Sequence, residues 1–162
     1  MNAEAILLTP LGPLALAGTD AGLSAVTFLD EAVPPTPTAA VPDCLRAAHQ
    51  QLLAYFGREL RAFDLVYAPA HGTDFQRRVW AALLAIDYGR TASYLDVAKR
   101  LDNPKSVRAV GAANGQNPLA LVWPCHRIVG ADGSLTGYAG GTHRKRWLLE
   151  FEQPTRQGGL FG

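Results

Sequence analysis

The chain has 162 residues, of which 48% are hydrophobic, and its formal net charge is +1. This length and composition are typical of a globular protein with one domain or two small ones. Its two cysteines, Cys44 and Cys125, lack CxxC spacing, which argues against a disulfide framework or a cysteine-based zinc site. No apolar stretch is long enough to span a bilayer, and no basic residue precedes the short apolar run near the start. We therefore expect a cytoplasmic protein without a bound metal.

Charge is distributed unevenly along the sequence. Residues 1–70 hold three basic and seven acidic residues, a net of −4, whereas residues 71–162 hold twelve basic and seven acidic residues, a net of +5. A basic region is the part of a chain that attracts a polyanion such as DNA. An uneven surface that only interacts with solvent explains the same counts, so charge alone favours neither interpretation.

Residues 1–70 predict a small α/β domain. Three short apolar segments separated by turn sequences predict an antiparallel three-stranded sheet. These segments are residues 5–9, 14–18 and 23–29. A proline-rich connection over 31–42 leads to a helix that Asp43 is expected to cap and Gly57 to end. A further strand is expected over 63–67.

Residues 71–162 predict a mostly helical domain. Thr73 is expected to cap a helix, because an apolar stripe at helical spacing follows it. The stripe consists of Phe75, Val79, Leu83 and Ile86. Ser93 caps a second predicted helix over 94–101, and residues 102–104 separate it from a third over 105–114. Two short helices around a three-residue turn are typical of a helix-turn-helix.

The exposed side of the third predicted helix carries Arg108 beside Gly111 and Ala112 in place of long charged side chains. Small residues allow a helix axis to approach its partner closely. The minor groove of DNA is such a partner, and Arg108 is then placed to enter the base stack as a wedge. A helix whose small face packs against another helix fits the same pattern equally well, so both interpretations stay open.

The most unusual stretch is Pro124-Cys125-His126-Arg127, because its polar residues interrupt an apolar run. A thiol is a strong nucleophile only as the thiolate, which requires a nearby base or positive charge. Because His126 and Arg127 supply both, we interpret Cys125 as a nucleophile and not as a small buried hydrophobe. Cys44 lies in the first turn of a predicted helix and is interpreted as packing.

A last helix is predicted over residues 144–152, and it places Glu152 on an apolar side. On the helical wheel this carboxylate falls between Leu148 and Leu149, whereas Glu150 points the opposite way. A carboxylate on an apolar face requires a partner, because burying an unpaired charge is costly. We expect that partner to be His126.

Residues 72–152 closely resemble the catalytic domain of the O6-alkylguanine-DNA alkyltransferases, also called methylated-DNA–protein-cysteine methyltransferases. The match is colinear, and the Pro-Cys-His-Arg core is fairly specific by itself. The blocks that carry it are Gly72-Thr73, Phe75-Gln76, Val79-Trp80, Tyr88-Gly89, Thr91, Ser93-Tyr94, Arg108-Ala109-Val110-Gly111, Asn117-Pro118, Pro124-Cys125-His126-Arg127, Gly137-Tyr138, Gly140-Gly141, Lys145, Leu148-Leu149 and Glu152. Residues 1–70 match only in pattern. The resemblance implies a ribonuclease H-like α/β domain over 1–70 and a DNA-binding, alkyl-transfer domain with a helix-turn-helix over 71–162.

The resemblance also implies a mechanism. Cys125 would attack the alkyl carbon on O6 of guanine and keep the alkyl group as a thioether, so that each molecule acts once. His126 would activate the thiol through a bound water, and Glu152 would orient His126. Asn117 would brace the turn, while Tyr94 would hydrogen-bond the base and help to protonate the departing guanine. No cofactor is implied, because the damaged DNA is itself the alkyl donor.

The implied partner is double-stranded DNA that contains O6-alkylguanine, bound through its minor groove by a monomer. The target carbon lies inside the duplex, so the nucleotide must be flipped out before it can react. The candidate DNA contacts are Arg108, Gly111, Ala112 and Arg127. The candidate base-pocket residues are Tyr94, Ile128, Tyr138 and Ala139. Activity on O4-alkylthymine is left open.

Some positions depart from the family pattern, and other functions compete with alkyl transfer. Trp123 stands where a branched aliphatic is expected before the proline, which could reshape the packing behind Cys125. A non-catalytic sensor of alkylated DNA is the main alternative, although the presence of Cys125 weighs against it. A cysteine hydrolase would differ by repeated turnover. The interpretation as a transcriptional regulator depends on the helix-turn-helix alone, and such a protein would also need a sensor or dimerisation segment.

Overall fold

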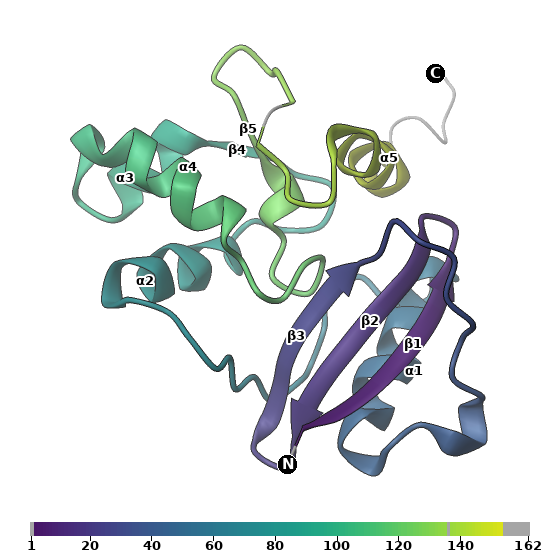
Figure 1. Ribbon diagram of the computed structural model, residues 1–162. Helices are drawn as coiled ribbons and strands as arrows, with labels where there is room; N and C mark the ends of the chain where they lie inside the picture. The colour runs from purple at the N-terminus through teal and green to yellow at the C-terminus, as the bar shows by residue number, and fades with distance from the viewer. Residues whose placement is uncertain (1, 136, 154–162) are drawn as a thin grey trace. The chain divides into compact units, whose positions relative to one another are not determined.

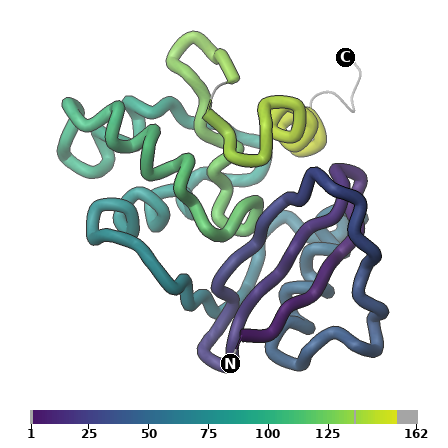
Figure 2. Tube along the Cα trace, viewed as in Figure 1, coloured from purple at the N-terminus to yellow at the C-terminus, as the bar shows by residue number. Residues whose placement is uncertain are grey.

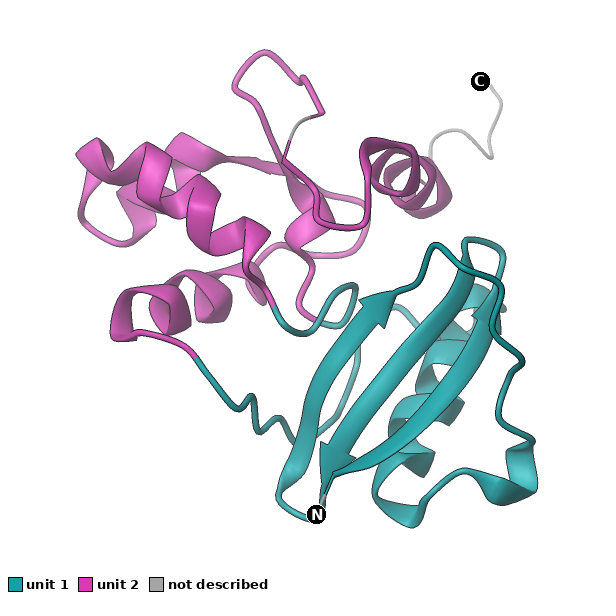
Figure 3. Cartoon of the chain, viewed as in Figure 1, with its two compact units in different colours: residues 1–71, 118–122 teal, residues 72–117, 123–162 magenta. Residues whose placement is uncertain are grey.

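The computed structural model describes residues 2–135 and 137–153, and the chain divides into two compact units (Figure 3). Unit 1 comprises Met1–His71 together with Pro118–Val122, and unit 2 comprises Gly72–Asn117 together with Trp123–Gly162. The short segment 118–122 therefore packs with the N-terminal part of the chain, which the sequence did not indicate. Among the helices of the described residues, none has the length and apolar character needed to cross a membrane.

Unit 1 contains an antiparallel sheet with the strand order β1-β2-β3 (Figure 1). The strands are β1 (Ala3–Thr9), β2 (Gly12–Thr19) and β3 (Gly22–Phe28). Alternate residues of the central strand, among them Leu14 and Leu16, are buried, as expected for a sheet with one face toward a core. The predicted three-stranded antiparallel sheet is confirmed, with each strand beginning one or two residues earlier than the apolar pattern suggests.

The helix α1 (Asp43–Phe56) packs on the sheet through Leu45, Leu52 and Tyr55, all fully buried. Gly57 ends the helix as expected. Asp43 does not cap it, because the cap position is Pro42 and the Asp43 carboxylate instead accepts a hydrogen bond from Arg46 at 2.9 Å. Both residues of this pair are exposed, so the interaction contributes little to stability.

Two short segments pair with β3 without forming strands of their own. The amide of Leu23 donates to the Val66 carbonyl at 2.9 Å, but the expected strand over 63–67 is reduced to one bridge. Val66 is exposed, so this segment lacks a buried face that would hold a longer strand in register. The Val26 amide donates to the Pro118 carbonyl, also at 2.9 Å, and Leu119 beside it is fully buried. This pairing attaches segment 118–122 to unit 1.

Unit 2 begins with α2 (Asp74–Leu83), whose capping box confirms the predicted start. The Thr73 hydroxyl accepts from the Gln76 amide at 3.1 Å, and the Gln76 side chain accepts from the Thr73 amide at 2.9 Å. The helix ends at Leu83, three residues before the last member of the apolar stripe. Ile86 is nevertheless buried in the turn that follows, so it belongs to the core that the stripe predicted.

The two helices α3 (Tyr94–Arg100) and α4 (Val107–Gly115) follow, joined by a turn that includes a 3-10 segment, Pro104–Ser106. Ser93 caps α3 as predicted, in a capping box with Asp96. The start of α4 lies two residues later than expected, because Pro104–Ser106 adopts the tighter 3-10 geometry. Figure 2 follows the trace through these helices toward the end of the chain.

The remaining elements of unit 2 bring its functional segments together. The short strands β4 (Ala92–Ser93) and β5 (Ile128–Val129) pair in parallel. This pairing places the first residue of α3 alongside the residues that follow Cys125. The last helix, α5 (Thr142–Glu152), confirms the predicted helix over 144–152 with two further residues at its start.

Candidate active site

The backbone around Cys125 is held in two consecutive tight turns. Pro124 has φ −79° and ψ 64°, the geometry of an inverse γ-turn, and the Cys125 amide donates to the Trp123 carbonyl at 2.7 Å. A 3-10 turn, Cys125–Arg127, follows immediately. Cys125 is 4% exposed. The sequence Pro-Cys-His-Arg therefore places a thiol at a fixed point inside the unit and not on a flexible loop.

His126 and Glu152 form the buried pair that the sequence predicted. The distance from His126 Nε2 to Glu152 Oε2 is 2.9 Å, and the two residues are 0% and 1% exposed. Glu152 occupies the last turn of α5, so this contact fixes the end of that helix against the residue that follows the cysteine. A carboxylate in this place orients the imidazole, which is the arrangement of a nucleophile, a base and an orienting acid.

Glu152 also binds Arg127. The guanidinium donates to the two carboxylate oxygens of Glu152 at 2.8 and 3.1 Å, and it donates to the Ile86 carbonyl at 2.6 Å. Burial alone would raise the pKa of Glu152, but the hydrogen bonds and charges of His126 and Arg127 outweigh it and lower the pKa to about 2. Glu152 is consequently ionised at neutral pH, although it is almost completely removed from water.

The protonation state of His126 follows from its surroundings. Burial lowers the pKa of His126, and the contact with Glu152 only partly opposes this effect. The imidazole is therefore neutral near pH 7, and its single proton lies on Nε2, where the ionised carboxylate accepts it. Nδ1 then carries a free lone pair, and it is buried without a hydrogen-bond partner among the described residues. His126 Nδ1 is thus the basic atom of the site.

Two asparagines hold the carbonyl groups on either side of Pro124. Asn117 donates from Nδ2 to the Trp123 carbonyl at 2.9 Å, in agreement with its predicted role of bracing the turn. Asn114 donates from Nδ2 to the Cys125 carbonyl at 3.2 Å. Asn114 lies in the last turn of α4 and is 2% exposed. The cysteine is therefore fixed by side chains as well as by its own backbone turns.

Tyr94, the first residue of α3, is half-buried in the same region. A Cβ atom added at Gly137 would lie 3.4 Å from the Tyr94 hydroxyl, and one added at Gly111 would lie 3.7 Å from the ring. Both glycines thus border this tyrosine. The ammonium of Lys145 lies 6.0 Å from the centre of the Tyr94 ring, a distance that permits a cation–π interaction.

The residues predicted to line the base pocket differ in exposure. Ile128 is fully buried in β5, Tyr138 is buried, and Ala139 is exposed. The Tyr138 hydroxyl has no hydrogen-bond partner among the described residues. Burial raises the pKa of Tyr138 well above its usual value, and the charge of Cys125 contributes further, so the hydroxyl stays protonated.

The residues predicted to bind DNA divide into two groups. Arg108 and Ala112 are exposed on α4, and Gly111 is half-buried against Tyr94. Arg127 is different, because it is 7% exposed and its guanidinium is held by Glu152 and Ile86. Inside unit 2 the Arg127 side chain thus supports Glu152, and the expected DNA contact of Arg127 stays a prediction.

Trp123, one of the residues that depart from the family pattern, packs against Trp80 of α2. Their ring centres are 5.7 Å apart with 30° between the ring planes. Trp80 also donates from Nε1 to the Ala113 carbonyl at 2.8 Å, a buried contact to the last turn of α4. Trp123 therefore fills the space behind the Pro124 turn and joins it to α2 and α4.

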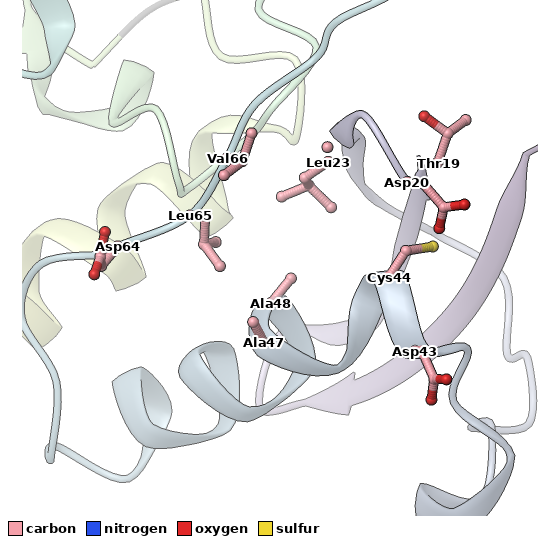
Figure 4. Close-up of a pocket in the computed structure, with 11 residues that line it drawn as sticks. Thr19, Asp20, Leu23, Asp43, Cys44, Ala47, Ala48, Asp64, Leu65 and Val66 are labelled. Atoms are coloured by element: carbon pink, nitrogen blue, oxygen red, sulfur yellow. The ribbon is translucent and has the colours of Figure 1, made fainter.

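The second cysteine lies in unit 1, at a pocket of about 430 Å³ (Figure 4). Its lining includes Asp20, Asp43 and Asp64 together with small and aliphatic side chains. Among the described residues that line this pocket there is no histidine, lysine or arginine that would favour a thiolate at Cys44. Cys44 therefore lacks the neighbours that favour a thiolate in this lining, and Cys125 remains the candidate nucleophile.

Two residues of the site were missed by the sequence reasoning. Asn114 has a detectable signal, because a polar residue near Val110 and Ala113 on the buried side of α4 requires a buried partner. Lys145 is fully buried, and burial lowers the pKa of its ammonium while the charge of Cys125 opposes that shift. Lys145 stands between two other basic residues, Arg144 and Arg146, so the sequence gives no comparable signal that it is the buried one.

A buried thiol beside a neutral imidazole and an ionised carboxylate defines a protein that uses cysteine as a nucleophile. Comparisons with known proteins identify the family. Residues 74–154 match the model described as 6-O-methylguanine DNA methyltransferase, DNA binding domain. A methylated-DNA–protein-cysteine methyltransferase of Mycobacterium tuberculosis is 50% identical over 147 residues, which cover 90% of this chain and 88% of that protein.

Solved structures agree with the sequence comparisons. The crystal structure of Mycobacterium tuberculosis O6-methylguanine methyltransferase superposes with a TM-score of 0.82 at 47% identity, covering 94% of this chain and 93% of that one. The structure of Mycobacterium tuberculosis OGT in complex with DNA gives a TM-score of 0.81 at 47% identity, with 93% and 92% covered. The chain belongs to the methylated-DNA–protein-cysteine methyltransferase family.

Proposed function

We propose that this protein repairs DNA by transferring the alkyl group of O6-alkylguanine to its own Cys125, in one irreversible step per molecule. The observation that carries the proposal is the buried contact of His126 with Glu152, directly beside the cysteine. Family membership supports the same reaction, because the relatives are named for methyl transfer from DNA to a protein cysteine. The chemistry lies in unit 2, within the proposed alkyl-transfer domain over 71–162.

The nucleophile is activated by removal of the thiol proton. His126 Nδ1 accepts this proton through one bridging water, because side chains of consecutive residues point in different directions. Glu152 stabilises the imidazolium that forms, since its carboxylate is already ionised and hydrogen-bonded to Nε2. Arg127 holds the carboxylate from its other side and keeps the acceptor geometry fixed.

The transfer itself is a single displacement at the alkyl carbon. The Cys125 sulfur forms a bond to that carbon while the bond from the carbon to O6 breaks, and the electron pair leaves with the guanine. Tyr94 hydrogen-bonds the base and helps to deliver the proton that neutralises the departing guanine. Ile128, Tyr138 and Ala139 line the base pocket. The product is a thioether, which is not hydrolysed under mild conditions, so the protein is consumed and no cofactor takes part.

The proposed DNA-binding mode uses α3 and α4 as a helix-turn-helix in the minor groove. Arg108 is exposed on α4, and its side chain fills the stack that the flipped nucleotide leaves. Ala112 is exposed on the same helix, and Gly111 lies next to it with no side chain to obstruct the groove. A relative of known structure has been solved in complex with DNA, which supports DNA as the partner.

Unit 1 is proposed to have the ribonuclease H-like fold, on the basis of its antiparallel sheet and the packing of α1. The protein is proposed to act as a monomer in the cytoplasm. O6-alkylguanine is the proposed substrate, and O4-alkylthymine is a second substrate to be tested.

Mass spectrometry after incubation with a duplex containing O6-methylguanine tests the reaction. The expected result is one methyl group per protein, located on the peptide that contains Cys125 and not on the peptide that contains Cys44. Cys125→Ser should abolish the adduct, whereas Cys44→Ser serves as the matched control and should react like the wild type. A folded protein that binds the duplex but stays unmodified would instead be a sensor of alkylated DNA.

The DNA-binding mode requires a separate test. Arg108→Ala should slow methyl transfer from a duplex more than transfer from the free base O6-methylguanine, because only the duplex requires nucleotide flipping. Arg61→Ala, at an exposed position in unit 1, controls for the loss of one positive charge. Equal losses on both substrates would exclude Arg108 from a role in flipping.

A further inference from the structure

The last turn of α4 is attached to the residues around Cys125 by side chains as well as by packing. Asn114 donates to the Cys125 carbonyl at 3.2 Å, and the next residue toward the start of the helix, Ala113, accepts from Trp80 at 2.8 Å. Trp80 packs in turn on Trp123, two residues before the cysteine. A movement of α4 along its axis would therefore pull on the nucleophile through Asn114.

The two ends of the Asn114 amide are unequal in their bonding. Nδ2 binds the Cys125 carbonyl, whereas Oδ1 is buried without a hydrogen-bond partner among the described residues. Reversing the amide would bring Oδ1 against the carbonyl oxygen, so the contact with Cys125 decides its orientation. A buried acceptor without a partner costs roughly 1–3 kcal/mol, which a residue kept only for packing would avoid. An apolar side chain of similar size would fill the same space without that cost.

We propose that Asn114 is a positioning residue for alkyl transfer. Its side chain holds the Cys125 carbonyl, so that the position of α4 on DNA affects the direction from which the Cys125 sulfur attacks. This inference rests on the proposed function, because it assumes that Cys125 is the nucleophile and that α4 contacts DNA. Its effect differs from that of Asn117. Asn117 braces the Trp123 carbonyl from the loop beyond α4, whereas Asn114 acts on the cysteine from within the helix.

The first test compares the two substrates in Asn114→Leu, which keeps the volume of the side chain and removes its amide. We expect transfer from free O6-methylguanine to fall about tenfold, the effect of one lost hydrogen bond on the reacting group, and transfer from the duplex to fall further. Val79→Ala is the matched control, because Val79 is fully buried in α2 and its truncation loosens the same unit. In Val79→Ala the rates with the duplex and with the free base should fall by the same factor, because this variant changes only the fraction of protein that is folded.

The second test uses Asn114→Asp, whose side chain has the same shape. An ionised carboxylate cannot donate to the Cys125 carbonyl, but a protonated carboxyl group can. The rate of Asn114→Asp relative to the wild type should therefore rise as the pH falls through the pKa of the new carboxyl group. The same ratio for Asn114→Leu should stay constant. Circular dichroism at each pH verifies that all three proteins remain folded.

The outcomes separate the inference from the function on which it rests. Methyl transfer by the wild type, with wild-type rates in both Asn114 variants, would overturn the inference and leave the function intact. Equal losses on duplex and free base, matching those of Val79→Ala, would likewise reduce Asn114 to a structural role. Absence of transfer in the wild type would contradict the proposed function and the inference together.

Discussion

Glu152 Oε2 lies 2.9 Å from His126 Nε2, and the same oxygen accepts from Arg127 at 3.1 Å. One carboxylate thus serves both residues that follow the cysteine. Because Glu152 is ionised, it stabilises the imidazolium that forms when His126 takes a proton. Because it is also paired with a guanidinium, its charge does not stand alone in a buried place. The base of the reaction and the packing of the turn therefore depend on the same side chain.

Replacing this carboxylate should damage activity and stability together. In Glu152→Gln the imidazolium loses its counter-charge, so we expect the rate of transfer from free O6-methylguanine to fall about a hundredfold. Arg127 becomes a buried charge without a carboxylate, which should cost roughly 3–5 kcal/mol of unfolding free energy. Rapid-quench kinetics and urea denaturation measure the two effects.

Glu150→Gln is the matched control for this prediction, because Glu150 is an exposed residue of the same helix. It should keep the wild-type rate and stay within about 0.5 kcal/mol of the wild-type stability. A Glu152→Gln variant that reacts as fast as this control would remove Glu152 from the proton transfer.

Stability should decrease in acid because of the same residue. The pKa of Glu152 is about 2 in the folded protein and has an ordinary value of 4.5. A group with a lowered folded pKa stabilises the protein fully above its unfolded pKa, and this contribution is lost as the pH falls from about 4.5 toward about 2. The shift corresponds to about 3 kcal/mol at neutral pH. Urea titrations at pH 7, 4 and 3 should show the stability of the wild type approaching that of Glu152→Gln. A difference in unfolding free energy between the wild type and Glu152→Gln that does not change with pH would refute the lowered pKa of Glu152.

The pH dependence of the reaction should report His126. Burial lowers the pKa of this imidazole, so it remains an unprotonated base at pH values where an exposed histidine is already charged. The acid limb of the rate profile with free O6-methylguanine should therefore lie below pH 6.5. Stopped-flow measurements between pH 5 and 8 locate this limb, and His126→Gln should flatten it at a reduced rate. A limb above pH 6.5 would mean that His126 is charged in the folded protein, and the base would have to be sought elsewhere.

Features of the fold set by local sequence could be predicted. The capping boxes of Thr73 and Ser93 depend on residues three positions apart, so the starts of α2 and α3 follow from the sequence alone. The partnership of Glu152 with His126 was also accessible, because a carboxylate on an apolar helix face needs a buried partner. The local sequence of segment 118–122 does not indicate where this segment lies in the fold. Its place beside β3 results from pairing between residues far apart in the chain.

The environment of Arg127 shows where pattern and resemblance are insufficient. An arginine in a basic half of a chain suggests a contact with DNA, whereas the apolar run around Arg127 fits a side chain that turns inward, and the sequence does not decide between them. Its partners, Ile86 and Glu152, are 41 and 25 residues away in sequence. Only the three-dimensional arrangement reveals that the charge of Glu152 is shared between a base and a guanidinium. The burial of Asn114 has a signal in the sequence, but the identity of its partner does not, because it depends on how α4 meets the Cys125 turn.

The junction before α2 offers a test of packing that is independent of catalysis. Gly72 has φ +145°, and a Cβ added there would lie 2.6 Å from the ring of Trp80. Gly72→Ala therefore combines backbone strain with a collision against a buried indole, and we expect a loss of roughly 2–4 kcal/mol in unfolding free energy. The ring cannot retreat easily, because it packs on Trp123 and its Nε1 is bonded to Ala113.

Gly133→Ala separates the two contributions to this loss. Gly133 also has a positive φ, +84°, but no atom lies within 4 Å of an added Cβ. This variant should therefore show only the backbone cost, about 1 kcal/mol. Urea denaturation of both variants gives the difference, and tryptophan fluorescence should change in Gly72→Ala alone. Equal losses of unfolding free energy in the two variants would mean that the Trp80 ring moves aside for the methyl group. The Trp80–Trp123 pair would then not be a rigid support behind the cysteine.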